Sequence, residues 1–163
     1  MALPPEQIAA SRPLEIRRVR TPPDLRLMLA WIGEPADTRA LVREVRAFSR
    51  ALPQRWAARA GAIESASEAL RDALEAANAE ASLDAVRGAA VAMAALGEEA
   101  HAGIVTADLA LACALAASVG AAGKPSGAGG GDCAVIFAFG DDAAGRAAAA
   151  LRPRFSVFPV VPA

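Results

Sequence analysis

A glycine-rich segment in the last third of the chain holds the residue types that could take part in chemistry. From Lys124 to Cys133 the sequence reads Lys-Pro-Ser-Gly-Ala-Gly-Gly-Gly-Asp-Cys. Glycine tolerates positive φ and lets the backbone approach a ligand closely, and successive N–H groups in such a loop can form a concave site for an anion. Lys124 at the entrance could add a positive charge. The segment therefore predicts a loop that holds a phosphate or approaches a substrate.

Helices and strands on both sides must position this loop. A helical pattern that ends near Gly120 precedes it, and the apolar run Ala134–Phe139 that follows is typical of a buried strand. Near the start of the chain, the runs Leu14–Val19 and Leu25–Ile32 predict two strands of a hairpin. The other expected elements are a helix capped by Asp37 or Thr38, a helix over Gln54–Asn78, a helix capped by Ser82, a short helix over Ala143–Leu151 and a last strand over Phe155–Val160. This order predicts an α+β fold with a small, mostly antiparallel, four-stranded sheet and a helical block.

Composition excludes several classes of function. The 163 residues suggest one domain. The net charge of -1, from 17 basic and 18 acidic residues, argues against nucleic acid as a partner. The two cysteines lack the short spacing of a zinc site or a disulfide framework. The first ten residues lack the apolar core of a secretory signal, and the alanine-rich stretches are too interrupted to cross a membrane. We therefore expect a cytoplasmic protein with no membrane partner.

Two segments resemble conserved motifs of the GHMP kinase superfamily. The segment Gly120–Cys133 looks like the third motif of these kinases, in the form typical of bacterial phosphomevalonate kinases. The segment Trp31–Thr38 is similar to the Trp-Thr-Gly-x-x-Ala-Ser-Thr segment of the same enzymes, except that Ile32 replaces a threonine and Asp37 replaces a serine. The two matches lie about ninety residues apart, with a helical block between them. The resemblance implies a ferredoxin-like two-layer sandwich.

The resemblance covers only the C-terminal half of the family's enzyme. It assigns residues 14–163 to the GHMP kinase C-terminal domain and residues 1–13 to a leader or the remnant of an inter-domain segment. The family's Pro-x-x-x-Gly-Leu-Gly-Ser-Ser-Ala loop, which wraps the ATP phosphates, and its catalytic lysine or aspartate match nothing in these 163 residues. We therefore assign no catalytic residue to this chain and expect it to be inactive alone. An N-terminal GHMP kinase domain, from the same gene or a separate subunit, is the expected partner.

The family's activity supplies expectations for substrate, cofactors and site. It implies ATP-dependent phosphorylation of 5-phosphomevalonate to 5-diphosphomevalonate in isoprenoid-precursor synthesis, with ATP and Mg²⁺ as cofactors. By the same resemblance, the substrate or its phosphate would contact Lys124, Ser126, Gly127, Ala128, Gly129, Gly130, Gly131 and Asp132. No metal ligand is assigned. Asp132 could orient the loop by accepting backbone N–H bonds or could organise the cation and substrate. We favour the first role, because a free carboxylate would repel phosphates.

Two other interpretations remain open. The chain could be a non-catalytic interaction or dimerisation module, for example a homodimer, since surface normally buried between domains tends to drive association. It could also be half of a GHMP kinase for another acceptor, such as mevalonate or a sugar. Trp31, Trp56, His101 and Cys133 are expected to have structural roles.

Overall fold

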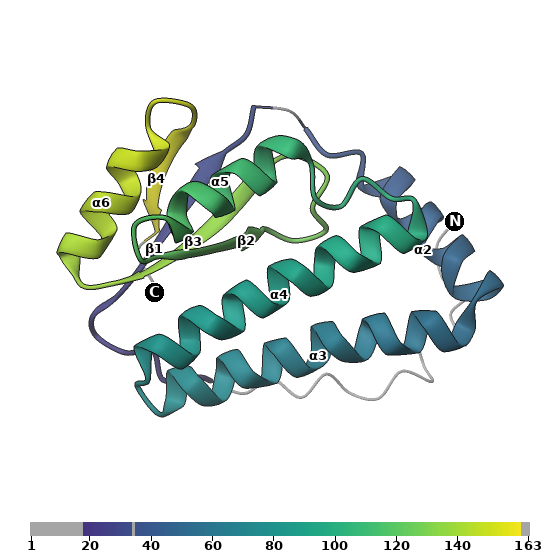
Figure 1. Cartoon of the computed structure of the whole chain (residues 1–163), viewed down its shortest axis with the longest axis horizontal. Coiled ribbons are helices and arrows are strands. Elements are labelled where there is room, and N and C mark those ends of the chain that lie inside the picture. Colours follow the sequence, from purple (N-terminus) through teal and green to yellow (C-terminus); the bar gives the residue numbers. More distant parts are fainter. Residues whose placement is uncertain (1–17, 34, 161–163) are drawn as a thin grey trace.

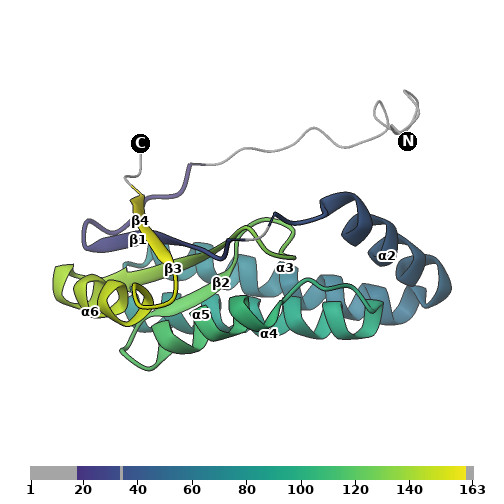
Figure 2. The ribbon, with the colours of Figure 1, turned by 90° about the horizontal axis from the view of Figure 1, so that it is seen from above.

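The structure of the chain is a computed structural model, in which residues 18–33 and 35–160 are described (Figure 1). The elements follow one another as β1 (Leu25–Trp31), α2 (Thr38–Ala51), α3 (Pro53–Glu75), α4 (Ala79–Ala100), α5 (Ala107–Ala117), β2 (Ala122–Pro125), β3 (Cys133–Phe139), α6 (Asp141–Leu151) and β4 (Ser156–Val160). Helices α3 and α4 form a long antiparallel pair, while α2 lies at the end of the molecule opposite α6 (Figures 1 and 2).

The four described strands form one antiparallel sheet in the order β2-β3-β1-β4. Strand β1 lies inside the sheet and pairs along its full length with β3, from Leu25 opposite Phe139 to Trp31 opposite Cys133. Strands β2 and β4 form the two edges. The α+β class, the four antiparallel strands and the helical block agree with the sequence-based prediction.

Alternate residues of the sheet face two different hydrophobic clusters. On one face, Met28 and Ile136 pack with Leu109 of α5 and Leu151 of α6, and small alanines let these helices approach closely. On the other face, Leu25 and Phe137 pack around Val86 of α4. A third cluster holds α2 against α3 and α4 through Leu41, Phe48 and Leu96. The sheet is therefore fixed between α5 and α6 on one side and the α3–α4 pair on the other.

Local side chains cap several helices, and the cap predicted at Asp37 is observed. The carboxylate of Asp37 accepts a hydrogen bond from the Ala40 N–H at 3.0 Å, and Thr106 caps α5 in the same way. Pro53 occupies the first turn of α3, where a missing N–H costs nothing. The predicted cap at Ser82 is wrong, because Asn78 caps α4 by accepting from the Ala81 N–H. Ser82 lies one turn inside the helix and is fully buried.

The last predicted strand is confirmed as β4, but one strand of the sheet differs from the prediction. The predicted strand Leu14–Val19 falls mostly outside the described residues, and its described part, Arg18 and Val19, is neither helix nor strand. The segment 1–13 also lies outside the described residues. The fourth strand of the sheet is β2, whose residues Lys124 and Pro125 were predicted to belong to the glycine loop. Pro125 is tolerated in this strand because β2 is an edge strand.

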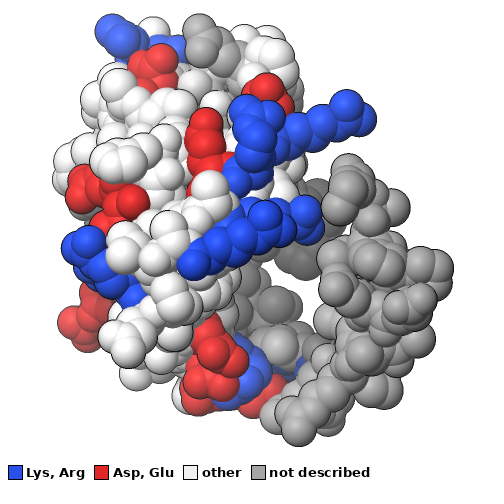
Figure 3. Space-filling model, turned by 90° about the vertical axis from the view of Figure 1, so that its right-hand side faces the viewer, with Lys and Arg blue, Asp and Glu red and all other residues white. Residues whose placement is uncertain are grey.

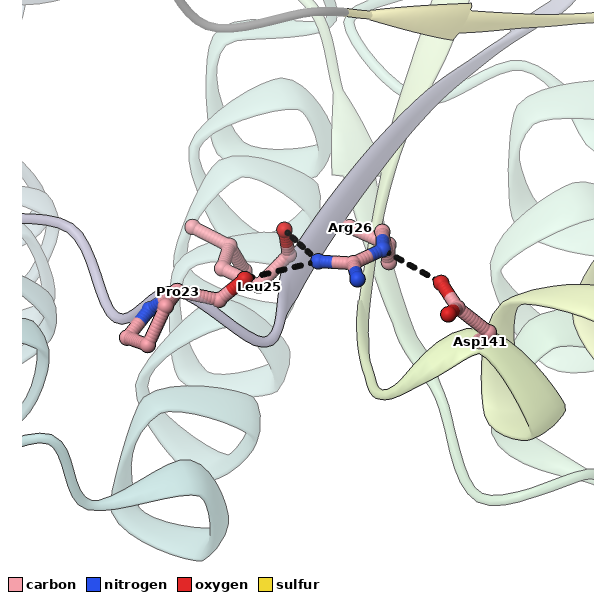
Figure 4. Close-up of polar contacts among 4 residues, drawn as sticks. All are labelled: Pro23, Leu25, Arg26 and Asp141. Atoms are coloured by element: carbon pink, nitrogen blue, oxygen red, sulfur yellow. Dashed lines mark hydrogen bonds and ion pairs between the residues drawn. The ribbon is translucent and has the colours of Figure 1, made fainter.

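A polar cluster joins the start of β1 to the start of α6. Arg26 donates from Nε to the carboxylate of Asp141 at 2.6 Å and from its terminal nitrogen to the Pro23 carbonyl at 2.9 Å (Figure 4). The Gly140 N–H also donates to the Asp24 carbonyl at 2.8 Å. Asp141 carries its negative charge in the first turn of α6, where the helix dipole favours it. These bonds fix α6 on the sheet at the end opposite the glycine-rich segment.

Candidate functional site

The glycine-rich segment forms a tight turn between β2 and β3, named here the glycine turn (residues 126–132). Its base is closed by the Ser126 N–H, which donates to the Cys133 carbonyl at 2.9 Å. Gly127, Gly129 and Gly130 have φ angles of 63°, 78° and 84°, which side chains other than glycine rarely adopt. The path of the turn therefore requires the glycines that the sequence places there.

The glycine turn is held closely against the segment between α4 and α5. The Gly130 N–H donates to the Ile104 carbonyl at 2.8 Å. A Cβ on Gly129 would lie only 2.1 Å from that same carbonyl oxygen, and one on Gly130 would lie 2.6 Å from Leu41 Cδ1. Gly129 and Gly130 are thus required for two reasons: their backbone conformation favours glycine, and there is no room for a side chain at either position.

Only part of the turn can offer N–H groups to a ligand. The N–H groups of Gly129 and Gly130 donate to the carbonyls of Ser126 and Ile104. Gly127 and Ala128 are exposed, and their N–H groups have no partner among the described residues. The N–H groups of Gly129 and Gly130 are therefore already used within the protein, so the set that could meet a ligand is narrower than the sequence analysis proposed.

The structure brings the two family-like segments together. Asp132 accepts a hydrogen bond at its Oδ1 atom from the Ala36 N–H at 3.1 Å, across 96 positions of sequence. Its carbonyl accepts a second one from the Ile32 N–H at 2.9 Å. Asp132 thus ties the end of β1 and the start of α2 to the glycine turn. This contact is the one that an orienting role for Asp132 requires.

Lys124 stands beside the turn and not at its tip. Its side chain projects from β2, is half-buried and donates to the Pro125 carbonyl at 3.1 Å. Burial lowers the pKa of this lysine, and the nearby Cys113 opposes that shift. Burial also raises the pKa of the Cys113 thiol to about 11, and burial followed by the charge of Asp132 raises that of Cys133. Neither cysteine has the lowered pKa of a nucleophile.

A groove of about 540 Å³ opens next to the glycine turn. Gly127, Ala128 and Lys124 form one part of its wall. Helices α2, α3 and α4, together with Ile104 from the segment between α4 and α5, form the rest, mostly with apolar side chains. Arg46 of α2 is the other charged residue that lines it among those described. The sequence analysis did not find this groove.

A row of arginines lies beside the groove. Arg39, Arg43, Arg46 and Arg50 follow one face of α2 at intervals of four, three and four residues and line a shallow hollow on the surface. Figure 3 views the end of the molecule that carries α2, where basic side chains project together. None of the four has an ion pair with a described residue. The helical spacing of the arginines is visible in the sequence and could have predicted this surface.

The described residues contain no group of three or more His, Cys, Asp or Glu side chains that could hold a metal ion. His101 ends α4 in the left-handed conformation and is exposed, as expected for a residue at a helix end. Within the described part of the chain, no helix has the length and hydrophobicity needed to cross a membrane.

The fold is that of the C-terminal domain of GHMP kinases. No protein-family model matches the sequence. The chain is 35% identical over 153 residues to the phosphomevalonate kinase of Streptomyces sp. (strain CL190), covering 90% of this chain and 39% of that protein.

Solved structures agree on the fold. The Streptococcus pneumoniae phosphomevalonate kinase in complex with phosphomevalonate and AMPPNP matches with a TM-score of 0.76 and 19% identity, over 90% of this chain and 43% of that one. The L. major mevalonate kinase in complex with R-mevalonate matches with a TM-score of 0.78 and 17% identity, over 90% and 45%. The chain therefore has the fold of a GHMP kinase C-terminal domain and is similar in sequence to a bacterial phosphomevalonate kinase. It spans about two fifths of the length of the proteins that it matches.

Proposed function

We propose that this chain is the C-terminal half of a two-domain GHMP kinase that transfers the γ-phosphoryl group of ATP to 5-phosphomevalonate, giving 5-diphosphomevalonate. The observation that carries the proposal is the tie between Asp132 and Ala36, at 3.1 Å, which brings both family-like segments to one site beside the exposed tip of the glycine turn. The 35% identity to a phosphomevalonate kinase supports the choice of acceptor.

The glycine turn would bind the phosphate that the acceptor already carries. Transfer between two phosphorylated molecules gathers negative charge, so the enzyme must position both and neutralise that charge. The N–H groups of Gly127 and Ala128 and the Ser126 hydroxyl would donate to phosphate oxygens. Lys124 would add a positive charge once its ammonium group leaves the Pro125 carbonyl. Asp132 would act through the turn, by holding its position against α2.

ATP and Mg²⁺ would be held mainly by the N-terminal domain. The described residues of this chain supply no cluster of carboxylates for the metal, and the exposed carboxylate of Asp132 is hydrogen-bonded to Ala36. Bound Mg²⁺ would neutralise the charge of the nucleotide phosphates. In this proposal, the residues of this chain bind the acceptor and do not contact the metal.

The proposal is tested by adding the N-terminal half of a relative. The chain should show no turnover alone. Mixed with the N-terminal half of the Streptomyces phosphomevalonate kinase, it should give ADP in a reaction that depends on 5-phosphomevalonate. Ser126→Ala should lower kcat/KM about tenfold to a hundredfold, because a hydrogen bond to a charged phosphate is lost. Ser65→Ala, on the exposed face of α3, is the matched control and should change nothing.

Parallel assays with mevalonate and with sugars decide between acceptors. Preference for either would assign the chain to a GHMP kinase with another substrate, an alternative motivated by Ile32 and Asp37, which depart from the phosphomevalonate kinase pattern. Stable association of the two halves without turnover on any acceptor would refute a role in phosphoryl transfer.

One observation favours a second candidate, an interaction or dimerisation module. Trp31 and Phe158 lie on the same face of the sheet, since Phe158 is opposite Leu29, and they are 50% and 53% exposed. Exposed aromatic side chains on a sheet face are typical of a surface that another domain covers. Light scattering after size exclusion should show a dimer that the Phe158→Ser substitution dissociates. A monomer at all concentrations would remove this candidate.

A further inference from the structure

The groove beside the glycine turn has an apolar floor that the proposed phosphoryl transfer does not use. Val45 of α2, Trp56 and Ile63 of α3 and Met93 of α4 supply side chains to it. All four are only partly buried, although they pack against the cluster that holds these helices together. Apolar side chains from three helices thus remain in contact with solvent along one concave surface. A ligand that covered them would gain hydrophobic free energy.

The charge on the groove has one sign. Arg46 and Lys124 line it from α2 and from β2, and no acidic residue does so among the described residues. Arg46 is exposed and has no ion pair with a described residue. A guanidinium and an ammonium group suit a phosphate, which accepts several charge-assisted hydrogen bonds.

We propose that the groove binds a monomeric anionic amphiphile, a molecule with a linear apolar chain and a phosphate head. The chain lies along Val45, Trp56 and Met93, and the phosphate binds at Arg46 and Lys124. Charge complementarity and the apolar lining together select this ligand class, since a small hydroxylated acceptor would leave the apolar side chains exposed to solvent. The proposed ligand shares Lys124 with the proposed acceptor site, but its binding does not depend on a role of the chain in phosphoryl transfer.

Fluorescence of Trp56 gives a direct test. The chain has two tryptophans, so Trp31→Phe leaves Trp56 as the single reporter. Octyl phosphate, below its micelle concentration, should change the emission saturably. Affinity should rise roughly two- to fourfold with each added methylene from butyl to octyl phosphate. Inorganic phosphate, octanol and octyltrimethylammonium should each bind at least tenfold more weakly than octyl phosphate.

Matched variants locate the site. Arg46→Ala should weaken octyl phosphate binding about tenfold or more, while Arg50→Ala, on the same helix but outside the groove, should leave it unchanged. Val45→Glu, with a negative charge in the groove, should abolish binding. Val91→Glu, at a 70% exposed position of α4, is its control. Circular dichroism of each variant separates loss of the site from loss of the fold.

Three results would overturn the proposal. They are the absence of saturable binding, equal binding of octyl phosphate and octyltrimethylammonium, and equal effects of the Arg46 and Arg50 substitutions. Co-sedimentation with phosphatidylglycerol vesicles separates a free amphiphile from a lipid headgroup. Vesicle binding without binding of monomeric octyl phosphate would also contradict it. Because these readouts need only this chain, they remain informative if the reconstituted kinase shows no turnover.

Discussion

Gly129 is the position where the glycine turn has least room, and replacing it by alanine gives a quantitative prediction. At φ +78° an alanine costs about 1–2 kcal/mol relative to a residue with an unstrained backbone. Its Cβ would also lie 2.1 Å from the Ile104 carbonyl oxygen. Reaching ordinary contact at 3.4 Å requires a movement of about 1.3 Å. That movement breaks the 2.8 Å bond from Gly130 to Ile104, worth about 1 kcal/mol. The expected loss of stability is therefore about 2–3 kcal/mol.

The control for this prediction lies in the same turn. Gly127 also has a positive φ, +63°, but a Cβ there would have nothing within 4 Å. Gly127→Ala should therefore cost only the backbone term, about 1–2 kcal/mol. Urea unfolding followed by circular dichroism measures both, and the midpoints of the two variants should differ by roughly 0.5–1 M. If Gly129→Ala were no less stable than Gly127→Ala, the close contact between the glycine turn and Ile104 would be refuted.

Two further predictions concern ionisable side chains. Cys113 has a pKa of about 11 against an ordinary 9.0, so it should react with iodoacetamide at pH 8 about a hundredfold more slowly than a free thiol. Lys124→Met should slow the reaction further, because the lysine charge lowers the pKa of this thiol. A rate equal to that of glutathione would contradict this prediction. The Arg59 hydrogen bond lowers the pKa of Glu99 below 4.5, so this pair stabilises the fold above that pH and is lost as acid protonates Glu99. Glu99→Gln should therefore lose less stability than the parent between pH 7 and pH 3 in urea titrations; an equal loss would contradict the assignment.

Local chemistry explains why much of the fold could be predicted from the sequence. Asp37, Thr106 and Pro53 act at helix ends through contacts within three or four residues, so their neighbours in sequence are enough to identify them. Strand β3 is an unbroken apolar run, which is typical of the middle of a sheet.

The parts that the sequence did not reveal depend on distant contacts. Strand β2 has four residues, one of them glycine and one proline, and carries no alternating pattern. It exists because β3 pairs with it and because α4 and α5 pack on it. At the start of α4, Asn78 and Ser82 both have capping side chains, and only the burial of Ser82 decides between them.

The candidate site could likewise be predicted only where its signals are local in the sequence. The sequence identified the glycine turn and the segment at the end of β1, because glycines and a carboxylate in a fixed order are a local signal. It could not show that Asp132 reaches Ala36 or that Ile104 uses the Gly130 N–H, since those partners lie far away in the sequence. The groove was missed for the same reason. The residues that line it are spread over several elements between Leu41 and Ala128, so no single element carries a sequence pattern that predicts the groove.

The two edge strands have a consequence for how copies of this domain can meet. Pro125 lies in β2 and Pro159 in β4, so each edge of the sheet carries a residue without an N–H group. In β2 the Ser126 N–H points inward to Cys133, so the neighbouring Pro125 nitrogen faces outward, where an incoming strand would need a donor. Main-chain extension of the sheet, the route by which exposed edges polymerise, is disfavoured at both edges because each lacks one donor. We therefore expect any assembly of this domain to use side-chain surfaces, which would make self-association responsive to single substitutions such as Phe158→Ser.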